Sequence, residues 1–242
     1  MRSQGTQPDS REEDVASFRA RRRVVEDYCT TRDVHHDVAA RLTAEGLSPV
    51  LDVGCGDGAL GRLLAGTPVR WVGLDRSAGM LARGPGPKLR GDAAALPFRD
   101  GAFGGAAALY MLYRLDEPRL AVAEAHRVLR AGGLFAAAAP SRFDAPELAD
   151  LLPQWPHAPS TFDAEVAPEV VGDVFGDVEV DAWDGPYIQL PDEEALRRYL
   201  AAYGVAAERA ALLAARHRNR VPLALTKRGA LVYARKRDGP AQ

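Results

Sequence analysis

Cysteine is scarce in this sequence, and long apolar runs are absent from it. Only two cysteines, Cys29 and Cys55, occur in 242 residues. They are too few for a disulfide framework and suit a reducing compartment. No stretch approaches the roughly 20 apolar residues that cross a bilayer, and the N-terminal residues lack the apolar segment of a secretory signal. These absences predict a cytoplasmic protein without a membrane partner.

The charge balance and the histidines argue against two further classes of protein. The formal net charge is −2, whereas proteins that bind nucleic acid usually carry a basic excess. The five histidines lack a clustered cysteine partner, so no metal site is predicted. Hydrophobic residues make up 47% of the chain and charged residues 26%, which is an ordinary globular composition with enough apolar side chains for a full core.

The length favours one large domain over two small ones. Residues 1–12 are polar and predict a disordered tail, and residues 13–242 are expected to form a single domain. Its core is expected within residues 47–140 and 176–237. Residues 13–45 and 141–220 are expected to supply a partly helical, partly irregular roof over one edge of the sheet.

Strands and helices alternate along the expected core, which predicts βαβ units and a mainly parallel sheet. In the first part we expect helices within 13–42, strands at 50–53, 70–75, 88–91, 106–111 and 134–139, and helices at 59–65, 78–83 and 117–129, the last closed by a glycine turn at 132–133. Ser77 can cap the helix at 78–83, because its hydroxyl accepts an otherwise unpaired backbone N–H. Further on we expect a strand at 178–183, a helix at 192–203 that starts at a Pro-Asp cap, a helix at 206–217, and strands at 223–226 and 230–234 joined by a turn at 227–229. The fold class is α/β with a Rossmann-like sheet.

The strongest functional signal is the segment LDVGCGDG at residues 51–58, between the first strand and a helix. Glycines there let the backbone approach a ligand closely. Gly56, Gly58 and Gly61 also fit the fingerprint of dinucleotide-binding proteins, with Asp75 where a ribose-binding acid is expected. Asp52 separates the two interpretations, because a carboxylate repels a pyrophosphate but attracts the amino group of S-adenosylmethionine (SAM). The loop therefore favours SAM.

Two residues near the end of the second strand fit the same ligand. Asp75 ends that strand, where its carboxylate can accept both ribose hydroxyls, and ligands of open α/β sheets bind at this edge. Met80 follows one turn into the next helix. It is either an adenine contact or an ordinary core residue, and the sequence leaves both open.

Five segments in order between residues 50 and 139 resemble class I SAM-dependent methyltransferases, and more narrowly the "type 11" group that includes ubiquinone- and menaquinone-type enzymes. The segments are LDVGCGDG at 51–58, GLD at 73–75, GDAAALPF at 91–98, AF at 102–103 and RVLRAGG at 127–133. The resemblance implies SAM as the cofactor and a contact set for each of its parts. That set comprises Asp52, Gly54 and Gly56 at the methionine end, the backbone of Leu109 and Tyr110 beside it, Asp75 at the ribose, Asp92 and Ala93 at the adenine, and Arg76 and Met80 near these.

The sequence departs from this family at two positions. Relatives usually carry an aspartate directly after the phenylalanine that here is Phe103, but this chain has Gly104. That aspartate is commonly a strand-entry feature, so little loss of cofactor binding is expected. Relatives often carry a histidine where this chain has Arg114. A guanidinium stays protonated, so no catalytic base can be inherited at that position.

Methyl transfer from a sulfonium mainly needs alignment of the reactants and exclusion of water, and a base is required only if the acceptor enters protonated. The candidate catalytic residues are Tyr110 and Tyr113 beside the cofactor, and His35 and His36 on an N-terminal helix. Adjacent helical residues face different directions, so at most one of the two histidines can point inward. Tyr28 is more typical of a packed aromatic.

The acceptor pocket is expected under the roof. Its candidate wall residues are Phe143, Trp155, Phe162, Trp183 and Tyr187. The sequence thus predicts transfer of a methyl group from SAM to a small molecule. An RNA methyltransferase, a catalytically silent SAM-binding module and a dinucleotide-dependent oxidoreductase remain open. Two arginine runs, at 21–23 and 216–220, are the best case for nucleic acid, but neither interleaves aromatic residues for base stacking.

Overall fold

The computed structural model describes residues 15–30, 32–84, 86–149, 151 and 158–237. The chain divides into two compact units. The sheet unit comprises Arg32–Gly185 and Thr226–Gln242, and the helical unit comprises Met1–Thr31 and Pro186–Leu225. The expected tail at 1–12 and the candidate wall residue Trp155 lie outside the described residues.

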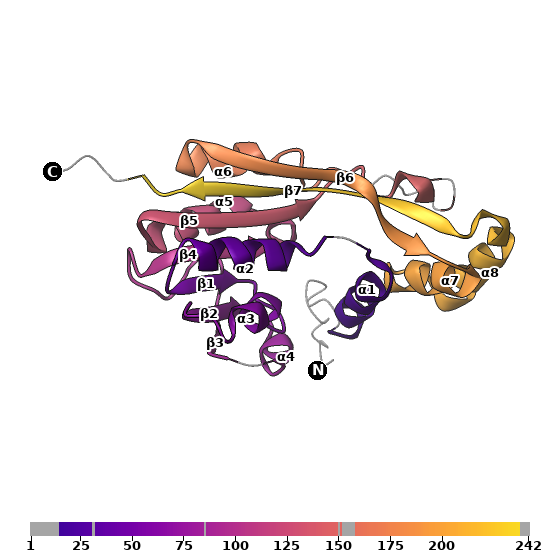
Figure 1. The fold of residues 1–242 in the computed structure, drawn as a ribbon, viewed down its shortest axis with the longest axis horizontal. Coiled ribbons are helices and arrows are strands. Elements are labelled where there is room, and N and C mark those ends of the chain that lie inside the picture. The colour runs from indigo at the N-terminus through magenta and orange to yellow at the C-terminus, as the bar shows by residue number, and fades with distance from the viewer. Residues whose placement is uncertain (1–14, 31, 85, 150, 152–157, 238–242) are drawn as a thin grey trace, which may run out of the picture. The chain divides into compact units, whose positions relative to one another are not determined.

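A single seven-stranded sheet has the strand order β3-β2-β1-β4-β5-β7-β6 (Figure 1). The strands are β1 Val50–Val53, β2 Trp71–Asp75, β3 Lys88–Arg90, β4 Phe103–Leu109, β5 Leu129–Pro140, β6 Val178–Leu190 and β7 Leu223–Arg235. Strands β1 to β5 run parallel to one another, and β7 runs antiparallel to β5. This sheet confirms the predicted α/β, Rossmann-like and mainly parallel fold.

The helices are α1 Val15–Tyr28, α2 Val34–Ala44, α3 Ala59–Leu64, α4 Ala78–Leu81, α5 Pro118–Val128, α6 Ala167–Phe175, α7 Glu193–Ala202 and α8 Ala207–Arg216, with 3-10 turns η1 Leu112–Arg114, η2 Pro146–Leu148 and η3 Arg218–Arg220. Three helices begin at a side chain that accepts backbone N–H groups of the first turn, namely Asp33, Ser77 and Asp192. Such a cap satisfies donors that the helix itself leaves unpaired. The cap at Ser77 and the start of α7 at Asp192 confirm the sequence prediction.

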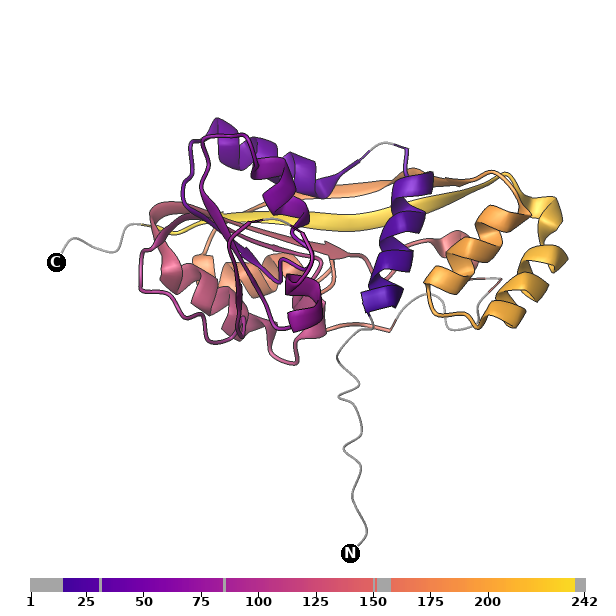
Figure 2. The same cartoon turned by 90° about the horizontal axis from the view of Figure 1, so that it is seen from below.

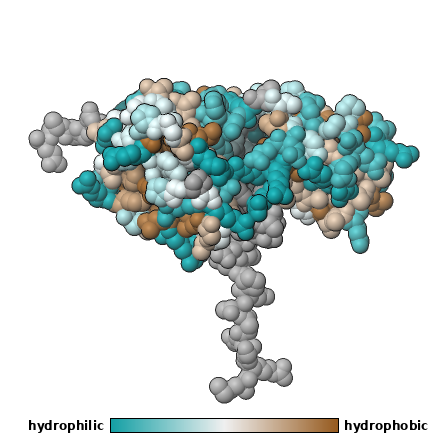
Figure 3. Space-filling view, turned by 60° about the horizontal axis from the view of Figure 1, so that its bottom comes forward, coloured by the Kyte–Doolittle hydropathy of each residue, from teal (hydrophilic) through white to brown (hydrophobic). Residues whose placement is uncertain are grey.

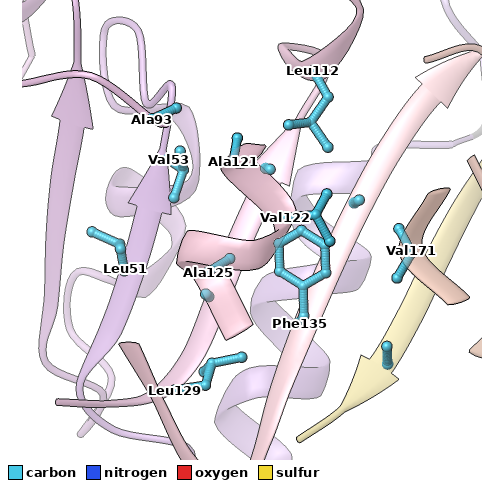
Figure 4. Close-up of a cluster of buried hydrophobic side chains, with 14 of the residues drawn as sticks. Leu51, Val53, Ala93, Leu112, Ala121, Val122, Ala125, Leu129, Phe135 and Val171 are labelled. Carbon is cyan, nitrogen blue, oxygen red and sulfur yellow. The ribbon is translucent and has the colours of Figure 1, made fainter. Parts of the chain in front are cut away.

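Helices cover both faces of the sheet in the sheet unit (Figures 1 and 2). On one face, α5 and α6 pack through Val122 and Val171 against Phe135 of β5 (Figure 4). On the other face, α2 and α3 bury Val38 and Leu60 against the sheet. Each fully buried aliphatic or aromatic side chain contributes about 1.5–3 kcal/mol to folding. These two layers hold the strand ends in fixed positions.

Two predicted turns are wrong. Helix α5 ends at Val128, and Leu129 already begins β5, so the glycines at 132–133 do not close the helix. They lie where the pairing of β5 with β4 shifts register between Leu129 and Leu134. The turn expected at 227–229 is part of the continuous strand β7, because Gly229 pairs with Pro140 and the carbonyl of Arg228 accepts the Ser141 N–H.

Helix α6 was not predicted, since no helix or strand was assigned between the strands expected at 134–139 and 178–183. It begins with a proline in its first turn and buries Val171 and Phe175. The ring of Phe175 stacks on Phe135 with centroids 5.3 Å apart. The helix is therefore fixed by a partner 40 positions earlier in the chain, which periodicity within nine residues does not reveal.

The surface mixes residue types. On the face drawn in Figure 3, hydrophilic residues are interspersed among hydrophobic ones. The large hydrophobic side chains that are exposed are Leu63, Leu89, Leu120, Phe143, Val180 and Leu212. Within the described ranges, no helix combines the length and the apolar character that a membrane crossing requires.

Candidate functional site

The carboxyl ends of β1, β2 and β4 meet at one edge of the sheet. Asp52 of β1 pairs with Gly73 of β2 on one side and with Ala107 of β4 on the other. Because all three strands are parallel, the loops that follow them leave the sheet side by side. The segment after β1 therefore lies between Asp75, which ends β2, and Tyr110, which follows β4.

The loop after β1 depends on glycine. Gly54, Gly56 and Gly58 all have positive φ, at +67°, +54° and +85°, a region that other residues reach only with strain. A Cβ atom on Gly54 would also lie 2.7 Å from Cγ of Met111. The loop is anchored to β2, since the N–H groups of Gly54 and Cys55 both donate to the carbonyl of Leu74. The result is a tightly turned backbone that carries no side chain of its own at three positions.

Asp75 fastens this loop from the neighbouring strand. Its Oδ2 accepts the Gly56 N–H at 2.8 Å, and its Oδ1 accepts the Ser77 N–H at 2.8 Å. The residue is only half-buried. Each carboxylate oxygen has a second lone pair, so Asp75 can still accept hydroxyl groups of a ligand while it holds the loop.

Asp52 is the most unusual carboxylate of the site. It is 3% exposed, and its Oδ2 has no hydrogen-bond partner among the described residues. Burial, and then the negative charge of Asp75, raise the pKa of Asp52 to about 8. A buried carboxylate oxygen without a partner is costly, and a cationic group at this position would relieve that cost. The orphan oxygen and the bare glycine loop together fit the ammonium end of SAM.

The loop after β3 carries Asp92 and Ala93. The carboxylate of Asp92 accepts the Ala94 N–H at 2.9 Å and the residue is exposed, whereas Ala93 is buried. The following segment is clamped from α5. Glu124 accepts the Leu96 N–H at 2.7 Å, and Arg127 donates to the carbonyls of Leu96 and Phe98 at 2.9 and 2.8 Å.

Glu124 and Arg127 were not among the predicted site residues, although Arg127 opens one of the motifs that carry the family resemblance. They also bond to each other at 2.7 Å, as residues three apart on a helix can. Their spacing in the sequence, an acid and an arginine three residues apart in a helix, could have predicted this ion pair.

The remaining cofactor candidates differ in exposure. Met80 is 9% exposed on α4, and Leu109 is 7% exposed at the end of β4. Arg76 is exposed, and its carbonyl accepts the Nε–H of Arg90 at 3.0 Å. Met80 thus has the burial of a core residue, and the position on α4 is compatible with either interpretation.

Tyr110 sits at the point where β4 ends. It is a non-glycine residue with φ +57°, and its N–H donates to the carbonyl of Ala138 at 2.9 Å. Burial raises the pKa of Tyr110 above its usual range, so its phenol stays protonated and acts as a hydrogen-bond donor. Tyr113 is half-buried, and the guanidinium of Arg114 lies 5.4 Å from its ring centroid.

Only one of the two candidate histidines faces this edge. The ring of His35 lies 6.1 Å from the ring of Tyr110, centroid to centroid, and its side chain is 30% exposed. His36 is exposed, in keeping with the expectation that at most one of the pair points inward.

The other candidates lie elsewhere. Tyr28 belongs to the helical unit, where its hydroxyl accepts from Arg198 at 2.9 Å, and Tyr187 is in the same unit. Phe162 is 0% exposed within the core, so its assignment to a pocket wall is wrong. Phe143 is 49% exposed. Trp183 packs against the α2 face of the sheet, with Arg32 5.0 Å above its ring.

No cluster of three or more histidine, cysteine, aspartate or glutamate side chains that could hold a metal ion occurs among the described residues. The polar groups at the strand ends instead suit an organic ligand with a cationic end and hydroxyl groups.

Known proteins share both the sequence motifs and the fold. Residues 51–137 match the methyltransferase domain family. The demethylmenaquinone methyltransferase of Renibacterium salmoninarum is 32% identical over 143 residues, which cover 52% of this chain and 58% of that protein. The 2-phytyl-1,4-naphtoquinone methyltransferase of Synechocystis sp. is 39% identical over 104 residues, which cover 36% and 44%. The chain therefore spans about half the length of the curated relatives it matches.

Among solved structures, the YcgJ protein of Bacillus subtilis superposes with a TM-score of 0.60 at 18% identity, covering 85% of this chain and 100% of that one. At this identity the superposition shows a common fold. Together with the domain match and the quinone methyltransferase relatives, it identifies residues 51–137 as a methyltransferase domain and indicates the class I SAM-dependent type.

Proposed function

We propose that this chain transfers a methyl group from SAM to a small-molecule acceptor. When bound, SAM supplies an electrophilic methyl group on a positively charged sulfonium. The observation that carries the proposal is the buried carboxylate of Asp52, whose Oδ2 has no hydrogen-bond partner within the described part of the chain. A carboxylate at this position would repel the pyrophosphate of a dinucleotide, which argues against a dinucleotide at the same loop.

Each polar group at the strand ends has a proposed role. Asp52 pairs with the amino group of SAM, and Gly54 and Gly56 allow the methionine end to approach the backbone. Asp75 accepts the ribose hydroxyls. Asp92 and the backbone of Ala93 contact the adenine, held in place by the clamp from α5.

We further propose that the acceptor is a small aromatic compound with a ring hydroxyl, of the reduced naphthoquinone class. The printed names of two relatives, which act on demethylmenaquinone and on a phytyl naphthoquinone, support this class. So does the pairing of a phenol and an imidazole beside the glycine loop, because Tyr110 can donate to an oxygen that His35 deprotonates. Cys29 and Cys55 are not joined by a disulfide, which supports our proposal of a cytoplasmic enzyme.

Calorimetry tests the cofactor, and labelled methyl groups test the reaction. SAM and its demethylated product, S-adenosylhomocysteine, are expected to bind, whereas NAD and NADP are not. The chain is then incubated with methyl-labelled SAM and reduced 1,4-naphthoquinone, and label is expected in the naphthalene product. NAD binding without SAM binding would overturn the proposal, and SAM binding without transfer to any small acceptor would favour a silent binding module.

A further inference from the structure

The N-terminal cap of α2 is built from a carboxylate that touches a histidine ring. Oδ1 of Asp33 accepts the backbone N–H of His35 at 2.9 Å and that of His36 at 3.4 Å. The same oxygen lies 3.5 Å from Nδ1 of His35. Interaction with His35 is the largest cause that lowers the pKa of Asp33, to about 2. The carboxylate is therefore both fixed by the helix and ionised beside the imidazole.

The same imidazole lies beside Tyr110, at the proposed reaction site. The ring of His35 is tilted by 41° against the ring of Tyr110 at 6.1 Å. Tyr110 directly precedes Met111, whose side chain packs on Gly54 of the glycine loop. The three side chains Asp33, His35 and Tyr110 thus form a series that leads from the start of α2 to the edge where β1 and β4 end.

We propose that Asp33 is a positioning residue that holds the proton of His35 on Nδ1, so that Nε2 is free to take the hydroxyl proton of the acceptor. The inference rests on the proposed function, because it assumes an acceptor that enters with an O–H group. In the step, the O–H bond of the acceptor breaks, the proton binds Nε2 of His35, and the electron pair stays on the acceptor oxygen. The imidazolium is stabilised by the ionised Asp33 and later returns the proton to water.

Other groups at this edge are unsuited to that step. Tyr110 stays protonated, and the guanidinium of Arg114 is protonated at any accessible pH. Lys227 is ion-paired with Asp144. His35 supplies the imidazole at this edge, and a base acts efficiently only if its free nitrogen faces the substrate in the correct tautomer.

The test must separate capping from positioning, because Asp33 does both. Asp33→Ser keeps a good helix cap but removes the carboxylate from Nδ1. Asp33→Asn keeps the cap and an acceptor oxygen beside Nδ1 but removes the charge. Asp192→Ser is the matched control, since Asp192 caps α7 by accepting the Ala195 N–H at 2.8 Å. The readout is the pair of ¹⁵N resonances of the His35 ring, assigned by their loss in His35→Gln.

In the wild-type chain, Nδ1 is expected to carry the proton. Asp33→Ser is expected to give a mixture of the two tautomers, whereas Asp33→Asn and Asp192→Ser are expected to leave the proton on Nδ1. With SAM and reduced 1,4-naphthoquinone, His35→Gln should lower kcat about 100-fold and the two Asp33 variants about ten-fold, each with unchanged SAM affinity.

Three outcomes overturn the proposal. They are an Asp33→Ser variant with the wild-type tautomer, a changed tautomer with unchanged kcat, and a wild-type chain that binds SAM but leaves reduced 1,4-naphthoquinone unmethylated. Loss of SAM binding in the wild-type chain is a different failure. It would remove the proposed function, while the ¹⁵N measurement would still decide whether Asp33 sets the tautomer of His35.

Discussion

The carboxylate of Asp75 accepts the backbone N–H of Gly56 at 2.8 Å, across 19 positions of the sequence. This bond joins the end of β2 to the middle of the glycine loop that follows β1. The other oxygen of Asp75 accepts the N–H of Ser77, so one side chain orders two consecutive ligand loops. A group proposed to bind the ribose therefore also shapes the loop proposed to bind the methionine end.

Replacing Asp75 should accordingly cost more than its ligand contacts. Asp75→Ala is expected to weaken SAM binding by about 1.5–3 kcal/mol, as for hydrogen bonds to a charged group, and to lower the thermal midpoint of the ligand-free chain slightly. Calorimetry and thermal unfolding measure both effects. Asp57→Ala is the control, because Asp57 lies in the same loop but its carboxylate pairs with Arg62. An unchanged dissociation constant for Asp75→Ala would show that this carboxylate does not hold the ribose.

The raised pKa of Asp52 makes stability and SAM binding depend on pH in opposite directions. Between its ordinary value of 3.8 and about 8, the folded chain keeps a proton on Asp52 that the unfolded chain releases. The free energy of unfolding of the ligand-free chain therefore falls as pH rises through this range. A cationic ligand favours the ionised carboxylate, so SAM affinity should rise by up to about ten-fold per pH unit between pH 5.5 and 7.5.

Proton release on binding measures this linkage directly. At pH 7, calorimetry in buffers with different ionisation enthalpies should show about one proton released per SAM bound. Asp52→Asn should abolish the release and weaken binding, yet stabilise the ligand-free chain above pH 8 because no charge is buried. Proton release that persists in Asp52→Asn would assign the linkage to another group.

Gly54 should tolerate a methyl group far less well than another glycine of similar backbone geometry. Gly54 and Gly46 have φ of +67° and +62°, so alanine at either position costs about 1–2 kcal/mol of backbone strain. A Cβ on Gly46 meets nothing within 4 Å, whereas one on Gly54 lies 2.7 Å from Cγ of Met111. Urea unfolding should show Gly54→Ala less stable than Gly46→Ala by a further 1–3 kcal/mol or so. Equal losses would mean that Met111 moves aside freely.

The clamp formed by Arg127 should matter for SAM binding although it lies outside the predicted contact set. Its guanidinium donates to the carbonyls of Leu96 and Phe98 and to Glu124. Arg127→Met keeps much of the apolar stem but removes the hydrogen bonds that the guanidinium donates. We expect SAM affinity to fall several-fold through loosening of the loop that carries Asp92. Arg119→Met on the exposed face of α5, where Arg119 pairs with Asp173, is the control and should bind SAM normally.

How much the sequence predicted follows from how local each feature is. The glycine loop, Asp75 and the caps at Ser77 and Asp192 depend on residues a few positions apart, and their positions were predicted correctly. The continuous β7 was missed because its middle looks like a turn and is held straight by Ser141 and Gly229 pairing across the sheet. Turn-like composition was outweighed by partners remote in sequence.

The site shows the same division. Both His35 and His36 were candidate catalytic residues in the sequence, and only the packing of His35 near Tyr110 distinguishes them. The clamp of Glu124 on Leu96 spans 28 positions, so the spacing of Glu124 and Arg127 indicates their mutual ion pair but not the loop that they hold. Phe162 was misassigned for the same reason, since an aromatic in an irregular segment gives no sign of whether it enters the core or a pocket.

The last prediction is that the acceptor is a small molecule and not RNA. The strongest case for RNA is a group of three arginines. Arg216 ends α8 and Arg218 lies in η3, both exposed, and Arg220 also lies in η3. Affinity for a polyanion depends on neutralised phosphates and falls steeply with salt. With a net charge of −2, the whole chain offers no general attraction, so binding to mixed RNA should be weak at physiological salt.

A salt series with mixed RNA decides between the two acceptors. Local arginines can give some binding at low salt, and it should vanish in the triple variant Arg216→Gln, Arg218→Gln, Arg220→Gln without any change in methylation of reduced 1,4-naphthoquinone. Because the sheet unit contains the proposed SAM site and the arginines belong to the helical unit, the two properties are separable by mutation. Tight RNA binding at physiological salt, lost in the triple variant together with methyl transfer to RNA, would replace the small-molecule acceptor by a nucleic acid.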